Sequence, residues 1–153
     1  MRLKIIFILS FTLFNLMSSQ CGLPAEFADF RGLTDEEKHE KFKKLPLEKQ
    51  VDFHLVMMGY HPPDMGYAFD IAAEGEKTLP YLIERLEKEK EDYRKNDILF
   101  IFEALQIKSV DLRKKEEVLA ALRRVIDKMD NPSQKKIAET SLQFIKGHEP
   151  KYK

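Results

Sequence analysis

Apolar residues recur along most of this chain with the period of an α-helix. Leu79, Leu82, Ile83 and Leu86 occupy the i, i+3, i+4 and i+7 positions of one segment, and the charged residues Glu84, Arg85, Glu87 and Lys88 lie on the opposite side. This spacing places the four apolar side chains on one helical face, which in a soluble domain packs against the core. The pattern predicts an amphipathic helix that begins near Leu79.

Capping and breaking residues indicate where other helices begin and end. Thr34 is followed three residues later by Glu37, the capping-box pattern of a helix start. Pro46 suits the first turn of the next helix, and Gly59 suits a left-handed residue at its end. The pattern predicts about seven helices, over roughly 35–44, 46–58, 64–74, 79–86, 98–105, 111–129 and 132–146.

The apolar run Ile98–Phe102 fits either a buried strand or a buried helix. We interpret it as a buried helix, because its neighbours are helical and no partner strand is predicted. The last helix is expected to bury Ile137, Ser141, Phe144 and Ile145. The predicted fold class is therefore all-α, in one domain over residues 34–153.

The N-terminal segment has the pattern of an export signal. Arg2 and Lys4 precede an apolar run from Ile5 to Met17. This run is shorter than the roughly 20 apolar residues that span a bilayer. We predict a signal peptide over residues 1–20, a tether over 21–33 and an exported helical domain after it.

Charge and cysteine content narrow the function classes. The chain has 26 Lys+Arg and 26 Asp+Glu, and loss of residues 1–20 removes only Arg2 and Lys4, which leaves a net charge near −2. Nucleic-acid binders show a strong basic excess or a basic stripe, so nucleic acid is not an expected partner. Cys21 is the only cysteine, so no internal disulfide is expected.

The third and fourth predicted helices, the fifth and sixth, and the seventh alone resemble successive helical hairpins, and three segments among them share a similar tail of small and aromatic residues. They are Ala68–Gly75, Phe100–Leu105 and Thr140–Gly147, and the segment Glu76–Ile83 is similar to the Leu-Pro-x-Leu start of a second helix in HEAT repeats. The stretch 65–147 thus resembles the HEAT-like class of α-solenoids. The resemblance implies stacked antiparallel hairpins that bind partners, and it brings no catalytic residues. An irregular helical bundle is the alternative.

The region around Cys21 resembles the processing site of a bacterial lipoprotein. Cys21 matches the lipidated cysteine, whereas the preceding Ser18, Ser19 and Gln20 depart from the Leu-Ser/Ala-Gly/Ala pattern. The resemblance implies a lipid on Cys21 and a membrane-anchored lipoprotein of the bacterial cell envelope. The alternative is ordinary cleavage, which leaves a free secreted or periplasmic domain.

Two groups of residues suggest chemistry. Soft imidazole and thioether ligands suit copper outside the cytoplasm, and a cluster of them falls within twelve residues: His54, Met57, Met58, His61 and Met65. Methionine at helical spacing is, however, an ordinary core residue. We predict no metal site and no cofactor.

The second group is His61 and Asp64, which flank a Pro-Pro turn and have the residue types of a base and its orienting partner. No nucleophile motif accompanies them. The simpler interpretation is a rigid turn in which Asp64 caps the following helix. We expect His39 and His148 to be solvated.

These patterns predict a non-enzymatic, exported helical-repeat domain that binds another envelope or extracellular protein. The predicted recognition loop contains Tyr60, His61, Asp64 and Tyr67, because aromatic rings on a proline-stiffened loop offer contact area at little entropic cost. The alternatives are an exported metal-binding protein or hydrolase that uses the region His54–Asp64, and a protein inhibitor or immunity-type factor.

Overall fold

The computed structural model describes residues 22–60 and 62–147. Every regular element in these ranges is helical, and no strand occurs in them. The prediction of an all-α fold is therefore confirmed. The chain divides between Leu33 and Thr34 into two compact units, which are described separately.

The described part of the first unit is folded around a short helix. The 3-10 helix η2 (Ala25–Phe30) follows Pro24. Phe27 and Phe30 are buried, and their rings meet edge to face with centroids 6.2 Å apart. The Arg31 guanidinium donates a hydrogen bond of 2.6 Å to the Leu23 carbonyl. The segment predicted as a tether thus carries a short helix of its own.

Seven α-helices make up the described part of the second unit. Thr34 and Glu37 form the predicted capping box at the start of the first, and the Asn131 side chain caps the last. The helices are α2 (Asp35–Phe42), α3 (Leu47–Met58), α4 (Gly66–Ala72), α5 (Leu79–Lys88), α6 (Asp92–Lys108), α7 (Glu116–Asp127) and α8 (Pro132–Ile145), with 3-10 turns η3 (Gly75–Thr78) and η4 (Leu112–Lys114).

The predicted left-handed conformation of Gly59 and two predicted helix starts are wrong, since α6 begins at Asp92 and not near residue 98. Gly59 ends α3 with φ −77°, an ordinary right-handed conformation, because the chain continues the turn instead of reversing it. The helix predicted from residue 111 begins at Glu116, after η4. Gly75 does adopt a left-handed conformation, with φ +74°, three residues after α4 ends.

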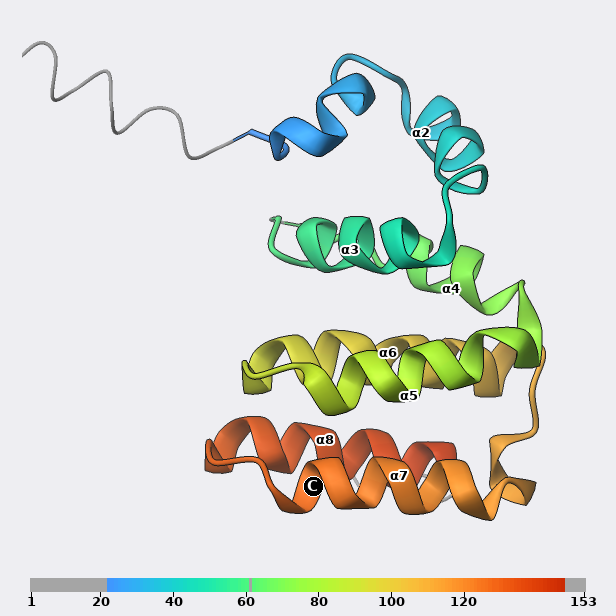
Figure 1. The fold of residues 1–153 in the computed structure, drawn as a ribbon, viewed down its shortest axis with the longest axis vertical. Coiled ribbons are helices and arrows are strands. Elements are labelled where there is room, and N and C mark those ends of the chain that lie inside the picture. The colour runs from blue at the N-terminus through green and yellow to red at the C-terminus, as the bar shows by residue number, and fades with distance from the viewer. Residues whose placement is uncertain (1–21, 61, 148–153) are drawn as a thin grey trace, which may run out of the picture. The chain divides into compact units, whose positions relative to one another are not determined.

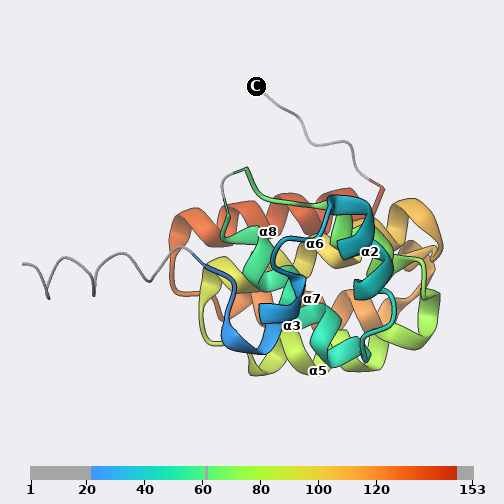
Figure 2. The same cartoon turned by 90° about the horizontal axis from the view of Figure 1, so that it is seen from above.

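The helices of the second unit stack as three pairs. Figure 1 shows α3 beside α4, α5 beside α6, and α7 beside α8. Helix α6 packs between α4 and α8, and α5 contacts α7. The result is two layers (Figure 2): α4, α6 and α8 form one, α5 and α7 form the other, and α3 runs obliquely and contacts α4 and α6.

The pairing differs from the predicted one by a single helix. The predicted hairpins paired α4 with α5 and α6 with α7. In the structure, α5 instead packs beside α6, and α7 packs beside α8. The turn between α5 and α6 is tight, because the Glu89 carboxylate accepts hydrogen bonds from the amides of Lys90 and Glu91. Apolar spacing defines the buried face of each helix, but it does not define its neighbour.

The core of this unit lies between the two layers. Leu82 and Leu86 of α5, and Leu99 and Phe102 of α6, are almost completely buried. None of the helices in the described ranges combines the length and apolar content that crossing a bilayer requires.

Candidate functional site

The predicted recognition loop is only partly at the surface. Tyr67 is fully buried, because it lies in the first turn of α4 and faces α2 and α3. Its ring centroid is 4.8 Å from that of Phe42 and 5.0 Å from that of Phe53. The prediction that Tyr67 meets a partner at the surface is therefore wrong. Tyr60 and Asp64 are half-buried, and His61 and Cys21 lie outside the described residues.

His39 forms the main polar contact between α2 and α4. Its Nδ1 lies 2.5 Å from Asp70 Oδ2, its Nε2 lies 3.9 Å from Asp64 Oδ2, and its ring stacks on Tyr67 with centroids 4.4 Å apart. A Cβ on Gly66 would lie 3.0 Å from the imidazole Cε1, so glycine permits this close approach. The prediction that His39 is solvated is wrong, since its partner Asp70 is 31 residues away and leaves no local signal.

This cluster orients a histidine but offers it no nucleophile. Burial raises the pKa of the Tyr67 hydroxyl, which has no hydrogen-bond partner in the described part of the chain. The Asp64 side chain instead accepts a hydrogen bond of 2.9 Å from the Gly66 amide, at the start of α4. We conclude that the cluster connects α2 to α4. Within residues 22–60 and 62–147, no group of three or more acidic, histidine or cysteine side chains is placed to hold a metal ion.

His54 joins α3 to α6. Its side chain is fully buried, and its Nε2 lies 3.1 Å from the Asp97 carbonyl oxygen. Burial lowers its pKa to about 4, so the imidazole is neutral near pH 7 and Nε2 donates this hydrogen bond. Met65, another member of the predicted copper cluster, is exposed at the start of α4.

Exposed apolar side chains gather on one layer of the fold. Among the described residues, the exposed large hydrophobic side chains are Met65 (48 %), Tyr93 (51 %), Ile107 (60 %) and Ile137 (51 %). All four belong to the layer of α4, α6 and α8. With the half-buried aromatic residues of the same helices they define what we call the apolar face: Met65, Phe69, Tyr93, Phe100, Ile107, Ile137 and Phe144.

The centre of the apolar face is a straight stripe on α6. Tyr93, Phe100 and Ile107 are seven residues apart, so they lie above one another on one side of the helix. The Phe100 ring meets Phe69 of α4 edge to face at 6.2 Å. The prediction that Ile137 is buried is wrong, because α8 turns its buried residues Ala138 and Leu142 inward and leaves Ile137 at the surface.

Two carboxyl groups flank Phe100 on this stripe. Asp97 precedes Phe100 by three residues and Glu103 follows it by three. Burial raises the pKa of Asp97 to about 6, which Arg94 opposes. Burial also raises the pKa of Glu103, and a hydrogen bond from Ser141 opposes this change. No ion pair within 4.0 Å involves either carboxylate in the parts of the chain that the structure describes.

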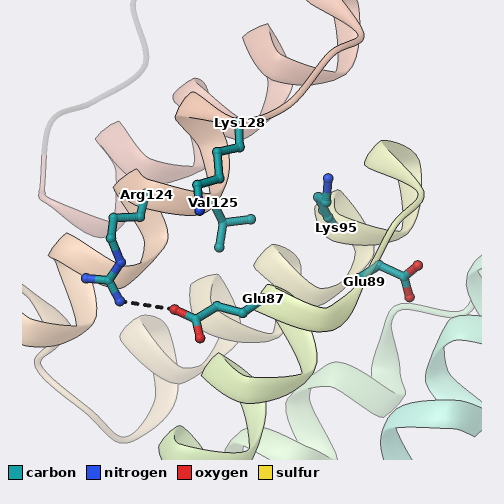
Figure 3. A pocket seen from close by; sticks show the side chains of 6 residues that line it. All are labelled: Glu87, Glu89, Lys95, Arg124, Val125 and Lys128. Atoms are coloured by element: carbon teal, nitrogen blue, oxygen red, sulfur yellow. Dashed lines mark hydrogen bonds and ion pairs between the residues drawn. The ribbon is translucent and has the colours of Figure 1, made fainter.

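A polar pocket of about 290 Å³ lies where α5, α6 and α7 meet. Figure 3 shows Glu87 reaching across to Arg124, and the two side chains form an ion pair of 3.0 Å. Lys95 is paired with Asp92 at 2.7 Å, and Glu89 accepts from Arg85 at 2.9 Å. Because most of its charges already have partners, this pocket is best explained as an ionic contact between helices.

A shallow groove of about 470 Å³ runs between α5 and α7 on the other layer. Leu79, Val118 and Ala121 line it but are themselves buried, and Ile83 is half-buried. An ion pair of 3.0 Å between Lys115 and Glu76 lies at the groove. Apart from the exposed Pro80, the apolar residues that line the groove are therefore buried or half-buried.

The sequence analysis did not predict the apolar face. Phe100 lies within the run Ile98–Phe102, and that run shows no polar side from which an exposed position could be recognised. The seven-residue spacing of Tyr93, Phe100 and Ile107 was the available signal. Comparison with protein-family models, with curated proteins and with solved structures gives no match for this chain.

Proposed function

We propose that this chain is a non-enzymatic binding protein whose apolar face holds another protein. The observation that carries the proposal is the concentration of exposed apolar side chains on one layer, because soluble domains rarely expose such residues together without a binding role. The centre of this surface is aromatic, and aromatic residues are enriched at the centres of protein interfaces. The stacked helix pairs support the same proposal, since stacked-hairpin folds use extended surfaces to bind partners.

Photo-crosslinking in extracts of the cells that make the protein tests this proposal. A photoreactive side chain at position 107, on the apolar face, should crosslink to one defined protein. The same group at position 83, on the groove between α5 and α7, is the matched control and should crosslink weakly or not at all. Crosslinks from position 83 alone would move the binding surface to the groove, and crosslinks from neither position would contradict the proposal.

We also propose that the domain works outside the cytoplasm, held to a membrane by a lipid on Cys21. The basic and apolar pattern of residues 1–20 supports export, and the position of Cys21 supports lipidation. Two acyl chains hold a protein stably on a bilayer, whereas one binds only marginally.

Expression in a bacterial host tests this part of the proposal. The wild-type chain should partition into detergent and incorporate labelled fatty acid, and Cys21→Ser should do neither. Equal solubility of both forms without label would instead support a secreted or periplasmic protein.

A further inference from the structure

The apolar face contains two acidic groups that form no ion pair within 4.0 Å in the described domain, although Arg94 acts on Asp97 electrostatically from a greater distance. Asp97 and Glu103 lie on either side of Phe100, each partly buried by its surroundings. A carboxylate that loses water without gaining a counter-charge is unfavourable. Arg94 and Lys108 are exposed at the two ends of α6, and neither forms an ion pair with these carboxylates.

We propose that the partner of the apolar face is an amphipathic helix whose apolar side is flanked by lysine or arginine residues. This inference rests on the proposed function. The stripe from Tyr93 to Ile107 is about 21 Å long at 1.5 Å per residue, which corresponds to about four turns of a partner helix. Cations on such a helix would neutralise Asp97 and Glu103 when contact removes their remaining water.

The same charges disfavour two other occupants. A second copy of this chain, docked through the same face by two-fold symmetry, would bring carboxylates towards carboxylates. An anionic membrane surface would repel both groups, because lipid surfaces of this kind attract basic segments. A basic amphipathic helix would cover the apolar stripe and neutralise the carboxylates that flank it.

Two synthetic helices of about 18 residues provide the test, with the same leucine side and either lysine or glutamate beside it. Isothermal titration of the full processed chain at about 50 mM salt should show the lysine helix binding about tenfold more tightly than the glutamate helix. The double variant Asp97→Asn/Glu103→Gln should reduce this preference to about twofold or less. Glu139→Gln, an exposed acid of α8 away from Ile137, is the matched control and should leave the preference unchanged.

A second variant separates this inference from the proposed function. Tyr93→Ser/Ile107→Ser changes two exposed side chains of the stripe, so the fold should persist while the affinity for both helices falls about tenfold or more. If this variant loses binding but Asp97→Asn/Glu103→Gln keeps the full lysine preference, the basic partner is overturned and the binding face stands. If Tyr93→Ser/Ile107→Ser binds both helices like wild type, the proposed function of this face fails as well.

The two other occupants are outcomes of the same experiments. Sedimentation of the wild-type chain should show no dimer that Tyr93→Ser/Ile107→Ser abolishes. Vesicles containing phosphatidylglycerol should bind the chain, freed of any lipid by Cys21→Ser, no better than neutral phosphatidylcholine vesicles. A dimer through the stripe, or a preference for the anionic vesicles that requires the stripe, would overturn the inference.

Discussion

At the scale of single residues, His54 and Asp97 meet where α3 contacts α6, and burial favours the neutral form of each side chain. The pKa of His54 falls to about 4, and the pKa of Asp97 rises to about 6. The two side chains therefore change the stability in opposite directions as the pH changes. As pH falls from 6.5 to about 4, unfolded His54 takes up a proton that the folded side chain does not, so stability decreases. As pH rises from 3.8 to about 6, unfolded Asp97 releases a proton that the folded side chain keeps, so stability also decreases.

Asp97→Asn should therefore raise the free energy of unfolding at pH 7. The change in pKa corresponds to about 3 kcal/mol for a fully buried group. Asp97 is only partly buried, so solvent screening reduces the expected gain to about 1 kcal/mol. Urea unfolding at pH 7 and at pH 4 measures the effect.

The gain from Asp97→Asn should almost vanish at pH 4, where the folded wild-type side chain is already neutral. Glu139→Gln, at an exposed position of α8, is the control and should show no gain at either pH. A loss of stability at pH 7, or an equal gain at both pH values, would contradict the burial argument.

At the scale of helices, the sequence predicts correctly those features that depend on interactions between nearby residues. The capping box at Thr34, the cap at Asn131 and the inward side of α5 depend on residues within a few positions of one another, and the structure confirms them. The contact of His39 with Asp70 depends on the packing of α2 against α4. No spacing within α2 encodes that contact, and the exposed stripe of α6 likewise depends on where α4 and α8 lie.

The inward side of α5 can be tested by truncation. Leu86 is almost fully buried, so Leu86→Ala should reduce the free energy of unfolding by about 2–5 kcal/mol, through lost apolar burial and the cavity left behind. Ile107→Ala, at an exposed position of α6, should change it by less than about 0.5 kcal/mol. Urea unfolding of both variants measures the difference. A smaller loss for Leu86→Ala than for Ile107→Ala would contradict the assigned layers.

At the scale of the whole second unit, α6 is both the centre of the core and the centre of the candidate binding surface. It contacts α3, α4, α5 and α8, and the stripe of Tyr93, Phe100 and Ile107 lies on the side that faces solvent. A surface built on such a helix is rigid, so little conformational entropy is lost when a partner binds. The acidic groups beside Phe100 lie on the same helix, so the proposed function would place specificity and affinity on one element.

This central position of α6 also predicts how the unit unfolds. In a linear stack of repeats, terminal pairs can separate from the rest, because each pair contacts only its neighbours. Here α8 packs more extensively along α6 of the neighbouring pair than along its own partner α7, so the pairs are strongly coupled and loss of the last pair would expose the buried residues of the central helix. We therefore expect an all-helical far-UV spectrum and one cooperative transition in urea for residues 34–147. Amide hydrogen exchange in α6 and α8 should report the same free energy of opening. Exchange from α7 and α8 at a clearly lower free energy would show that the last pair unfolds alone, and the stack would then behave as a set of independent repeats.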